Sequence, residues 1–102
     1  MNLKVIVVMN EKQKEALLIL QEECAEVIQA SSKIFRFGFD SCYPTEDSPT
    51  TRECLTMELG QLLCMVALLV DQKVVDENEL MNYMELKKKK LEKWSSIFKD
   101  AS

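Results

Sequence analysis

The sequence predicts an all-α protein: an antiparallel helical bundle that assembles into an oligomer. Its 102 residues include only two glycines and two prolines, well below the usual ~7% and ~5%. So few turn-forming residues disfavour a sandwich or barrel of short strands. Three long stretches with helical patterning instead each begin at a side chain that can cap a helix. A chain of this length is about one domain, so residues 1–102 are expected to form a single helical domain.

The first helix is predicted over residues 10–37. Asn10 can cap it, and Gln13, three positions later, completes a capping box. No Gly or Pro interrupts the stretch until Gly38, which supplies the stop. At 100° per residue, one face of this helix is apolar. That face contains Leu17, Leu20, Cys24, Val27, Ile28, Ile34 and Phe35.

The second helix is predicted over residues 50–71, after a loop over residues 38–49 that is rich in turn-forming residues. Thr50 and Glu53 match the Thr-x-x-Glu pattern of a capping box. From residue 55 to residue 70, apolar side chains point in every direction around this helix, and such a helix must be buried all round. The other two helices can each cover only one flank, so a second chain is expected to cover the rest, in a homodimer or a homotetramer. The alternative is the central helix of a monomer.

The third helix is predicted over residues 76–99, with Asp76 as its cap and Glu79 three positions later. Lys87 falls on its apolar stripe, which contains Leu80, Met84, Leu91, Trp94 and Phe98. A lysine on an inner face either extends its ammonium group to water or meets an anion. Lys87 is therefore a candidate for binding a phosphate.

Composition excludes several classes of function. The formal net charge of −4 lacks the basic footprint of a nucleic-acid-binding protein, and the absence of histidine excludes Ser–His and Cys–His catalytic pairs and most zinc sites. Four dispersed cysteines indicate reduced thiols and a cytoplasmic protein. The longest apolar run, Leu62–Val70, is nine residues and too short to span a bilayer, so no membrane association is expected. Residues 3–9 are expected to form a short strand or an arm.

Several glutamates lie at helix positions where a buried carboxylate would need a cation or a hydrogen-bond partner. Glu58 lies within the apolar second helix, with Gln61 one turn later, and burying an unpaired carboxylate is costly. In the first helix, Glu22, Glu23 and Glu26 form Glu-Glu-x-x-Glu, and residues three apart can address one point. Antiparallel packing would bring the two groups together into an oxygen-rich pocket, which suits Mg²⁺ or Mn²⁺. The alternative is an acidic helix face in solvent.

Basic residues continue the polar stripe of the first helix beyond its carboxylates. Lys33 and Arg36, with Gln29, lie on the same side as Glu22. Acidic residues at one end and cations at the other suit a metal–phosphate ligand. An ordinary exposed stripe with i,i+4 pairs is the competing interpretation.

Three segments resemble the MazG-like all-α nucleoside triphosphate pyrophosphohydrolases, in their short, phage-type, single-domain form. The segments are EECAEVIQASSKIFRFG, TRECLTMELGQLL and KKKKLEKW, and the resemblance covers residues 10–94. It implies an oligomeric helical bundle in the cytoplasm, the host cytoplasm if the protein is phage-encoded. It also implies Mg²⁺-dependent cleavage of a nucleoside triphosphate into a monophosphate and pyrophosphate.

The resemblance also implies roles for individual residues. Glu23 and Glu26 match metal ligands of the first motif, Glu58 matches the first ligand of the second, and Glu22 matches an acidic position suited to orienting or activating water. Gln61 departs from the family, which has aspartate there, and so removes one negative charge from the metal site.

Phosphate and base contacts follow from the same resemblance. Lys33 and Arg36 match basic positions suited to phosphate contact. Phe37 and Phe39 are candidates for base recognition, with ordinary packing at a helix end as the alternative. The expected function is thus an active pyrophosphohydrolase. One alternative is a catalytically weakened homologue that binds nucleotides or partners, and another is a plain helical dimerisation module.

Overall fold

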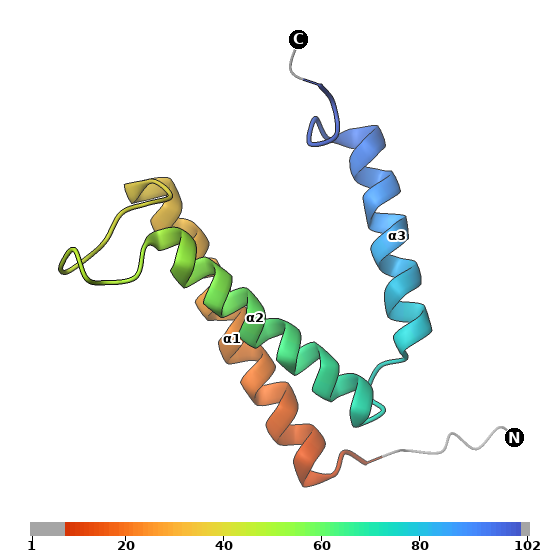
Figure 1. Ribbon diagram of the computed structural model, residues 1–102. Coiled ribbons are helices and arrows are strands. Elements are labelled where there is room, and N and C mark those ends of the chain that lie inside the picture. Colours follow the sequence, from red (N-terminus) through yellow and green to blue (C-terminus); the bar gives the residue numbers. More distant parts are fainter. Residues whose placement is uncertain (1–7, 101–102) are drawn as a thin grey trace, which may run out of the picture.

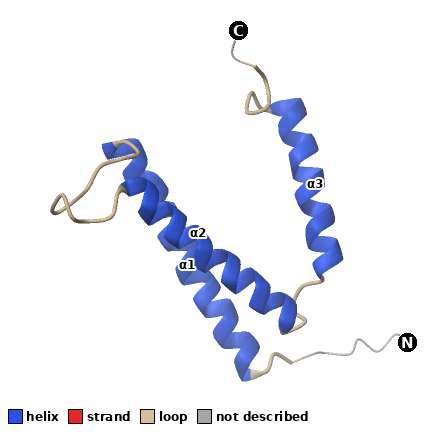
Figure 2. Cartoon of the chain, in the orientation of Figure 1, coloured by secondary structure: helices blue, strands red, loops and turns tan. Residues whose placement is uncertain are grey.

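Three helices account for the regular structure of residues 8–100, the part of the chain described by the computed structural model (Figure 2). They are α1 (Glu11–Phe37), α2 (Thr51–Asp71) and α3 (Glu77–Trp94). No regular strand occurs within residues 8–100, so the all-α prediction is confirmed. The strand or arm predicted over residues 3–9 lies largely outside the described residues.

The start and end of α1 follow the sequence signals. Asn10 Oδ1 accepts a hydrogen bond from the Gln13 backbone N–H at 2.8 Å, and Gln13 Oε1 accepts from the Asn10 N–H at 3.0 Å. This reciprocal pair is the predicted capping box. Gly38 ends the helix with φ +84°, where a side chain would be strained, and its N–H donates to the Ile34 carbonyl at 2.8 Å.

The caps of α2 and α3 are also formed. Thr50 Oγ1 accepts from the Glu53 N–H at 3.1 Å, and Asp76 Oδ2 accepts from the Glu79 N–H at 2.9 Å. The capping box predicted for α2 is only half formed. The Glu53 carboxylate accepts a hydrogen bond from the Thr50 hydroxyl at 3.1 Å. The Thr50 backbone N–H does not donate to this carboxylate, as a complete capping box requires.

The end of α3 differs from the prediction, which extended this helix to Lys99. It ends at Trp94, because Ser95 adopts an extended conformation with φ −121° and ψ 160°. The Ser95 hydroxyl oxygen accepts from the Ile97 N–H at 3.1 Å. This local side-chain bond offers the backbone an alternative to the helix.

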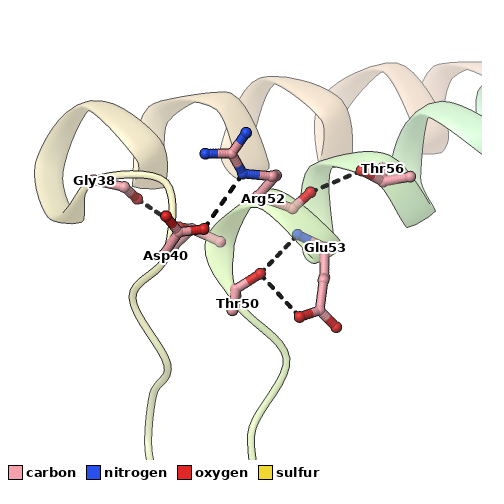
Figure 3. A network of polar contacts seen from close by, with 7 residues as sticks. Gly38, Asp40, Thr50, Arg52, Glu53 and Thr56 are labelled. Atoms are coloured by element: carbon pink, nitrogen blue, oxygen red, sulfur yellow. Dashed lines mark hydrogen bonds and ion pairs between the residues drawn. The ribbon is translucent and has the colours of Figure 1, made fainter.

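The loop between α1 and α2 is closed at its base by the first turn of α2 (Figure 3). Arg52 Nε pairs with Asp40 Oδ1 at 3.3 Å, and its guanidinium lies 4.7 Å from the centre of the Phe39 ring. The Arg52 N–H donates to the Phe39 carbonyl at 2.8 Å, and the Thr51 hydroxyl donates to the Gly38 carbonyl. These contacts hold the end of α1 beside the start of α2.

The helices α1 and α2 pack side by side and antiparallel, and we call this pair the hairpin (Figure 1). Its core consists of Ala16, Met65 and Leu69, with Leu17, Ile19 and Leu20 packed around them. The predicted apolar face of α1 is too wide. Cys24, Ile28 and Phe35 are exposed, the last at 90%, because α2 covers only the neighbouring flank.

The third helix diverges from the hairpin (Figure 1). No residue of α3 is buried. The radius of gyration is 18.4 Å, whereas a compact chain of this length has about 13 Å. The chain exposes 9044 Å², and a compact 11.8 kDa monomer exposes about 5,900 Å². A single chain is therefore not a closed bundle.

Most of the apolar surface of α2 remains exposed in this fold. An 18-residue window has a mean hydropathy of 1.7, and 11% of it is buried. By length and composition alone, α2 is able to cross a membrane, a property that core helices of soluble proteins share. Its exposed residues include Met57, Leu59, Leu63 and Leu68.

Candidate functional site

Three carboxylates from two helices meet at the middle of the hairpin. Glu23 and Glu26 come from α1 and Glu58 from α2, and one carboxylate oxygen of each lies within 4.8 Å of the others. Glu23 and Glu58 are half-buried and Glu26 is exposed. The i,i+3 spacing turns two α1 side chains toward one point, and antiparallel packing adds the third from α2. The predicted convergence of the two helices' carboxylates is confirmed.

A hydrogen bond between neighbouring carboxylates is the main influence on protonation in this carboxylate cluster, Glu23–Glu26–Glu58. The pKa of Glu58 is raised, first by a hydrogen bond with Glu26 and then by partial burial. The negative charges of Glu26 and Glu23 and a hydrogen bond with Glu23 raise it further. A proton on Glu58 thus relieves repulsion within the cluster. A cation bound there would displace that proton.

The amide of Gln61 completes the cluster from α2. With its nitrogen turned toward the carboxylates, Gln61 donates to Glu23 Oε2 at 3.1 Å and to Glu58 Oε2 at 3.0 Å. Gln61 therefore lies where the sequence places it, but it faces the cluster as a hydrogen-bond donor. To offer its carbonyl oxygen to a metal ion, the amide would have to rotate by about half a turn.

Glu22 is not part of the cluster. It is exposed and lies one position before Glu23, which turns its side chain about 100° around α1. The structure thus brings together two of the three acidic residues of Glu-Glu-x-x-Glu.

A hollow of about 530 Å³ lies between the end of α1, the loop and the start of α2. Two of the predicted ligand-binding residues, Lys33 and Phe37, line it. The other lining residues are Ala30, Ser41, Cys42, Tyr43, Pro49, Thr51 and Cys54. Ala30 lies one turn after Glu26 and Cys54 one turn before Glu58, so the hollow begins next to the cluster. Cys54 is not among the residues that the sequence predicts for the site, although its i,i+4 spacing from Glu58 could have indicated that it lies next to the cluster.

Arg36 and Phe39, the other two residues predicted to contact the phosphate or the base, do not line the hollow. The Arg36 guanidinium stacks on the Phe37 ring, 5.1 Å from its centre. Phe39 packs under Arg52 at the base of the loop. The structure therefore separates the two phenylalanines: one lines the hollow and the other closes the loop.

Lys87 lies on α3, in a second hollow of about 760 Å³. It shares the walls of this hollow with Leu80, Met84 and Leu91 of the predicted stripe and with Phe98, which lies beyond the end of α3, whereas Trp94 of the predicted stripe is exposed and does not line the hollow. Because α3 diverges from the hairpin, Lys87 does not meet the carboxylate cluster of its own chain.

The donor atoms of the cluster are all carboxylate oxygens, and the adjoining hollow combines an aromatic ring with a cation. Such a site can hold a hard cation and an anionic ligand with an apolar part. Comparison with protein-family models, curated proteins and solved structures gives no match for this chain.

Proposed function

We propose that this protein is a MazG-like nucleotide pyrophosphohydrolase that uses Mg²⁺ to cleave (d)NTP into (d)NMP and pyrophosphate. The convergence of Glu23, Glu26 and Glu58 at the centre of the hairpin is the observation that carries the proposal. The hollow that begins one turn from these carboxylates gives the nucleotide a place beside them. The resemblance of residues 10–94 to the family supplies the reaction.

The residues of the cluster fit a hard divalent cation. An acidic cluster alone does not select an ion, so the choice of Mg²⁺, with Mn²⁺ as a substitute, rests on the all-oxygen donor set and on the resemblance. Glu23, Glu26 and Glu58 would hold the ion. A bound ion would supply positive charge to offset the negative charge that develops on the phosphate oxygens during cleavage.

The other residues would position the nucleotide. In the proposed reaction, water attacks the α-phosphorus and releases a proton to solvent, the bond between this atom and the bridging oxygen to the β-phosphorus breaks, and pyrophosphate leaves. Lys33 and Phe37 both line the hollow, where Lys33 would contact a phosphate and the Phe37 ring would contact the base. Glu22, next to Glu23, and Arg36, next to Phe37, are exposed on α1 and would act only at the edge of the site.

The proposal includes assembly into a homodimer or homotetramer in which the helices form a closed bundle. Large apolar side chains are exposed on both α1 and α2, among them Ile28, Phe35 and Leu63. The excess exposed surface of about 3,100 Å² per chain is enough for an obligate interface, which buries about 2,000–5,000 Å² in total. Insertion of α2 into a membrane is the competing way to cover this surface.

A second candidate function is a nucleotide-binding homologue with weakened catalysis. Gln61 favours it, because its amide donates to Glu23 and Glu58 and occupies the position at which the family carries a further carboxylate. The amide partly satisfies the two carboxylates without a metal ion. Such a protein would bind nucleotides and turn them over slowly.

The decisive experiment incubates the protein with a panel of ribo- and deoxyribonucleoside triphosphates and Mg²⁺, followed by product analysis. The proposal expects monophosphate and pyrophosphate in equal amounts, and no product in the presence of a chelator. Thermal stabilisation by a nucleotide without hydrolysis would select the weakened homologue. Neither hydrolysis nor stabilisation would contradict both.

The assembly is tested separately by analytical ultracentrifugation at micromolar concentration. A dimer or tetramer is expected without detergent. An 11.8 kDa monomer, or a protein that stays in solution only with detergent, would contradict the proposed assembly.

A further inference from the structure

An exposed seam runs along α2 beside the carboxylate cluster. Met57, Gln61, Cys64 and Leu68 are spaced i, i+4, i+7 and i+11, so they form one line on the helix surface. All four are exposed, Met57 at 52% and Leu68 at 40%. Gln61 is the residue that contacts Glu23 and Glu58. The seam is therefore apolar except where it touches the cluster.

The third helix carries a seam of the same spacing. Leu80, Met84, Lys87 and Leu91 are also at i, i+4, i+7 and i+11, and all four line the hollow of about 760 Å³. This seam too is apolar except at one residue, Lys87. Two helices with apolar residues at this spacing pack together through such lines.

Antiparallel pairing of the two seams matches every position. It sets Leu91 against Met57, Lys87 against Gln61, Met84 against Cys64 and Leu80 against Leu68. The one lysine then meets the one polar residue, next to the negative charges of Glu23 and Glu58. Parallel pairing would set Lys87 against Cys64 and leave its charge beside a thiol. Charge complementarity thus selects the antiparallel register.

The turn between α2 and α3 directs α3 away from the hairpin, so this pairing is not formed within the chain (Figure 1). Lys73 takes φ +59°, its N–H donates to the Val70 carbonyl at 3.0 Å, and the Val74 N–H donates to the Leu69 carbonyl at 2.9 Å. These two bonds form a Schellman motif, which fixes the direction in which the chain leaves α2. The third helix, capped by Asp76, then diverges from the hairpin (Figure 1).

We propose that α3 packs antiparallel on α2 of a second copy of this chain and places Lys87 at that copy's carboxylate cluster. The surface each chain leaves exposed beyond that of a compact monomer, about 3,100 Å², is large enough for such an exchange of helices. The Lys87 ammonium offsets the repulsion among the three carboxylates in the free protein. When a nucleotide is bound it meets a phosphate, a contact that rests on the proposed function.

The contact between copies is tested first, without reference to activity, by zero-length carbodiimide cross-linking of lysine to carboxylate. The expected product is a covalent dimer whose cross-linked peptides join Lys87 to Glu23, Glu26 or Glu58. Lys87→Arg retains the charge but cannot couple, so it should lose this dimer. Lys89→Arg is the matched control, because Lys89 lies about 200° further around α3 and should leave the dimer unchanged.

Two cross-linking results would overturn the proposal. A link from Lys87 to the cluster at the mass of a single chain would show that α3 folds back on its own hairpin. A dimer linked from Lys87 to Glu79 or Glu85 would show that two α3 helices pair with each other.

Mixing of variants tests the role of Lys87 in the reaction. Glu58→Gln and Lys87→Ala should each lose hydrolysis, and co-refolding of the two should restore about a quarter of the wild-type rate. Random mixing makes about half of the dimers mixed, and each mixed dimer has one intact site of two. No recovery, with mixed dimers verified by mass, would overturn the proposal. An inactive wild type would contradict the proposed function, while the cross-link still decides the contact.

Discussion

The helices of the hairpin and α3 have similar N-terminal caps, but only the hairpin has buried residues. Asn10, Thr50 and Asp76 each cap a helix through a side-chain oxygen. The hairpin then buries Met65 and Leu69, whereas no residue of α3 is buried. Local signals therefore define where all three helices begin, but burial requires a second surface, which α3 does not find in its own chain.

This difference separates two kinds of candidate residue. The carboxylates of the hairpin meet because α1 and α2 pack on each other. Lys87 lies among apolar residues of α3 but faces an open hollow. Residues on the packed helices have neighbours within one chain, whereas the neighbours of residues on α3 are known only from the proposed assembly.

The largest expected effect concerns the packed region. Glu26→Gln should lower hydrolysis by at least ~100-fold, because loss of even an indirect partner of a metal ligand costs 10–100-fold. The exposed position of Glu26 means that the helical circular-dichroism signal should not change. Glu22→Gln is the matched control and should retain most of the activity. Equal losses in both variants would contradict the ligand assignment.

Core truncation compares the two regions directly. Met65→Ala should lower the free energy of unfolding by about 2–5 kcal/mol, because Met65 is 7% exposed in the hairpin core. Leu91→Ala should cost little in dilute solution and more as the protein concentration rises, since its proposed partner is a second copy. Denaturant unfolding at two concentrations measures both. A concentration-independent loss at Leu91 would place its contacts within one chain.

Gln61→Asp should have opposite effects with and without metal. In chelator, it replaces a donor to two carboxylates by a fourth negative charge and should cost about 1 kcal/mol, roughly 4–8 °C in melting temperature. Mg²⁺ should then stabilise the variant more than the wild type. Gln29→Asp, on the exposed face of α1, controls for added charge. Equal Mg²⁺-induced shifts in wild type and Gln61→Asp would show that position 61 does not face the metal.

A smaller effect is expected at the junction of the two regions. Lys73→Gly should stabilise the protein by about 0.5–1 kcal/mol, because a side chain at φ +59° is strained and glycine is not. Lys88→Gly, within α3, should destabilise by about 1 kcal/mol and serves as the control. A destabilised Lys73→Gly would show that the Lys73 side chain makes a contact that outweighs the strain.

The weakest expected effect is a pH dependence of the metal-free protein. Because the pKa of Glu58 is raised above its ordinary value of 4.5, the folded state binds its proton more tightly than the unfolded state. That stabilisation is present below pH 4.5 and is lost as the pH rises through the raised pKa. Melting temperatures measured across this range in chelator should fall more steeply for the wild type than for Glu58→Gln. Parallel curves for the two proteins would contradict a raised pKa of Glu58 in the folded state.

Much of the fold and part of the candidate site could be predicted from the sequence. Asn10 with Gln13, Thr50 and Asp76 are capping patterns that act within one turn, so the helix starts follow from neighbouring residues. The meeting of Glu23, Glu26 and Glu58 follows from helical spacing and antiparallel packing. These features depend on local geometry and one packing contact.

The remaining features depend on hydrogen bonds that cannot be predicted from the residue types alone. The Schellman motif at the end of α2 places a lysine where glycine is usual, so the direction of α3 had no sequence signal. Ser95 could have continued α3 or ended it, and its hydroxyl bond to the Ile97 N–H ended it. The donor role of Gln61 depends on the orientation of one amide relative to two carboxylates.

The closed base of the loop between α1 and α2 makes its tip a place for insertion. Since Arg52 and Thr51 tie the loop to the end of α1, the hydrogen bonds of the tip at residues 45–48 are local, between Thr45 and Ser48, and do not hold the two helices together. Doubling the length of a closed loop costs only about 0.6 kcal/mol. A fluorescent protein or an epitope inserted between Glu46 and Asp47 would report on this molecule in a cell without opening the hairpin.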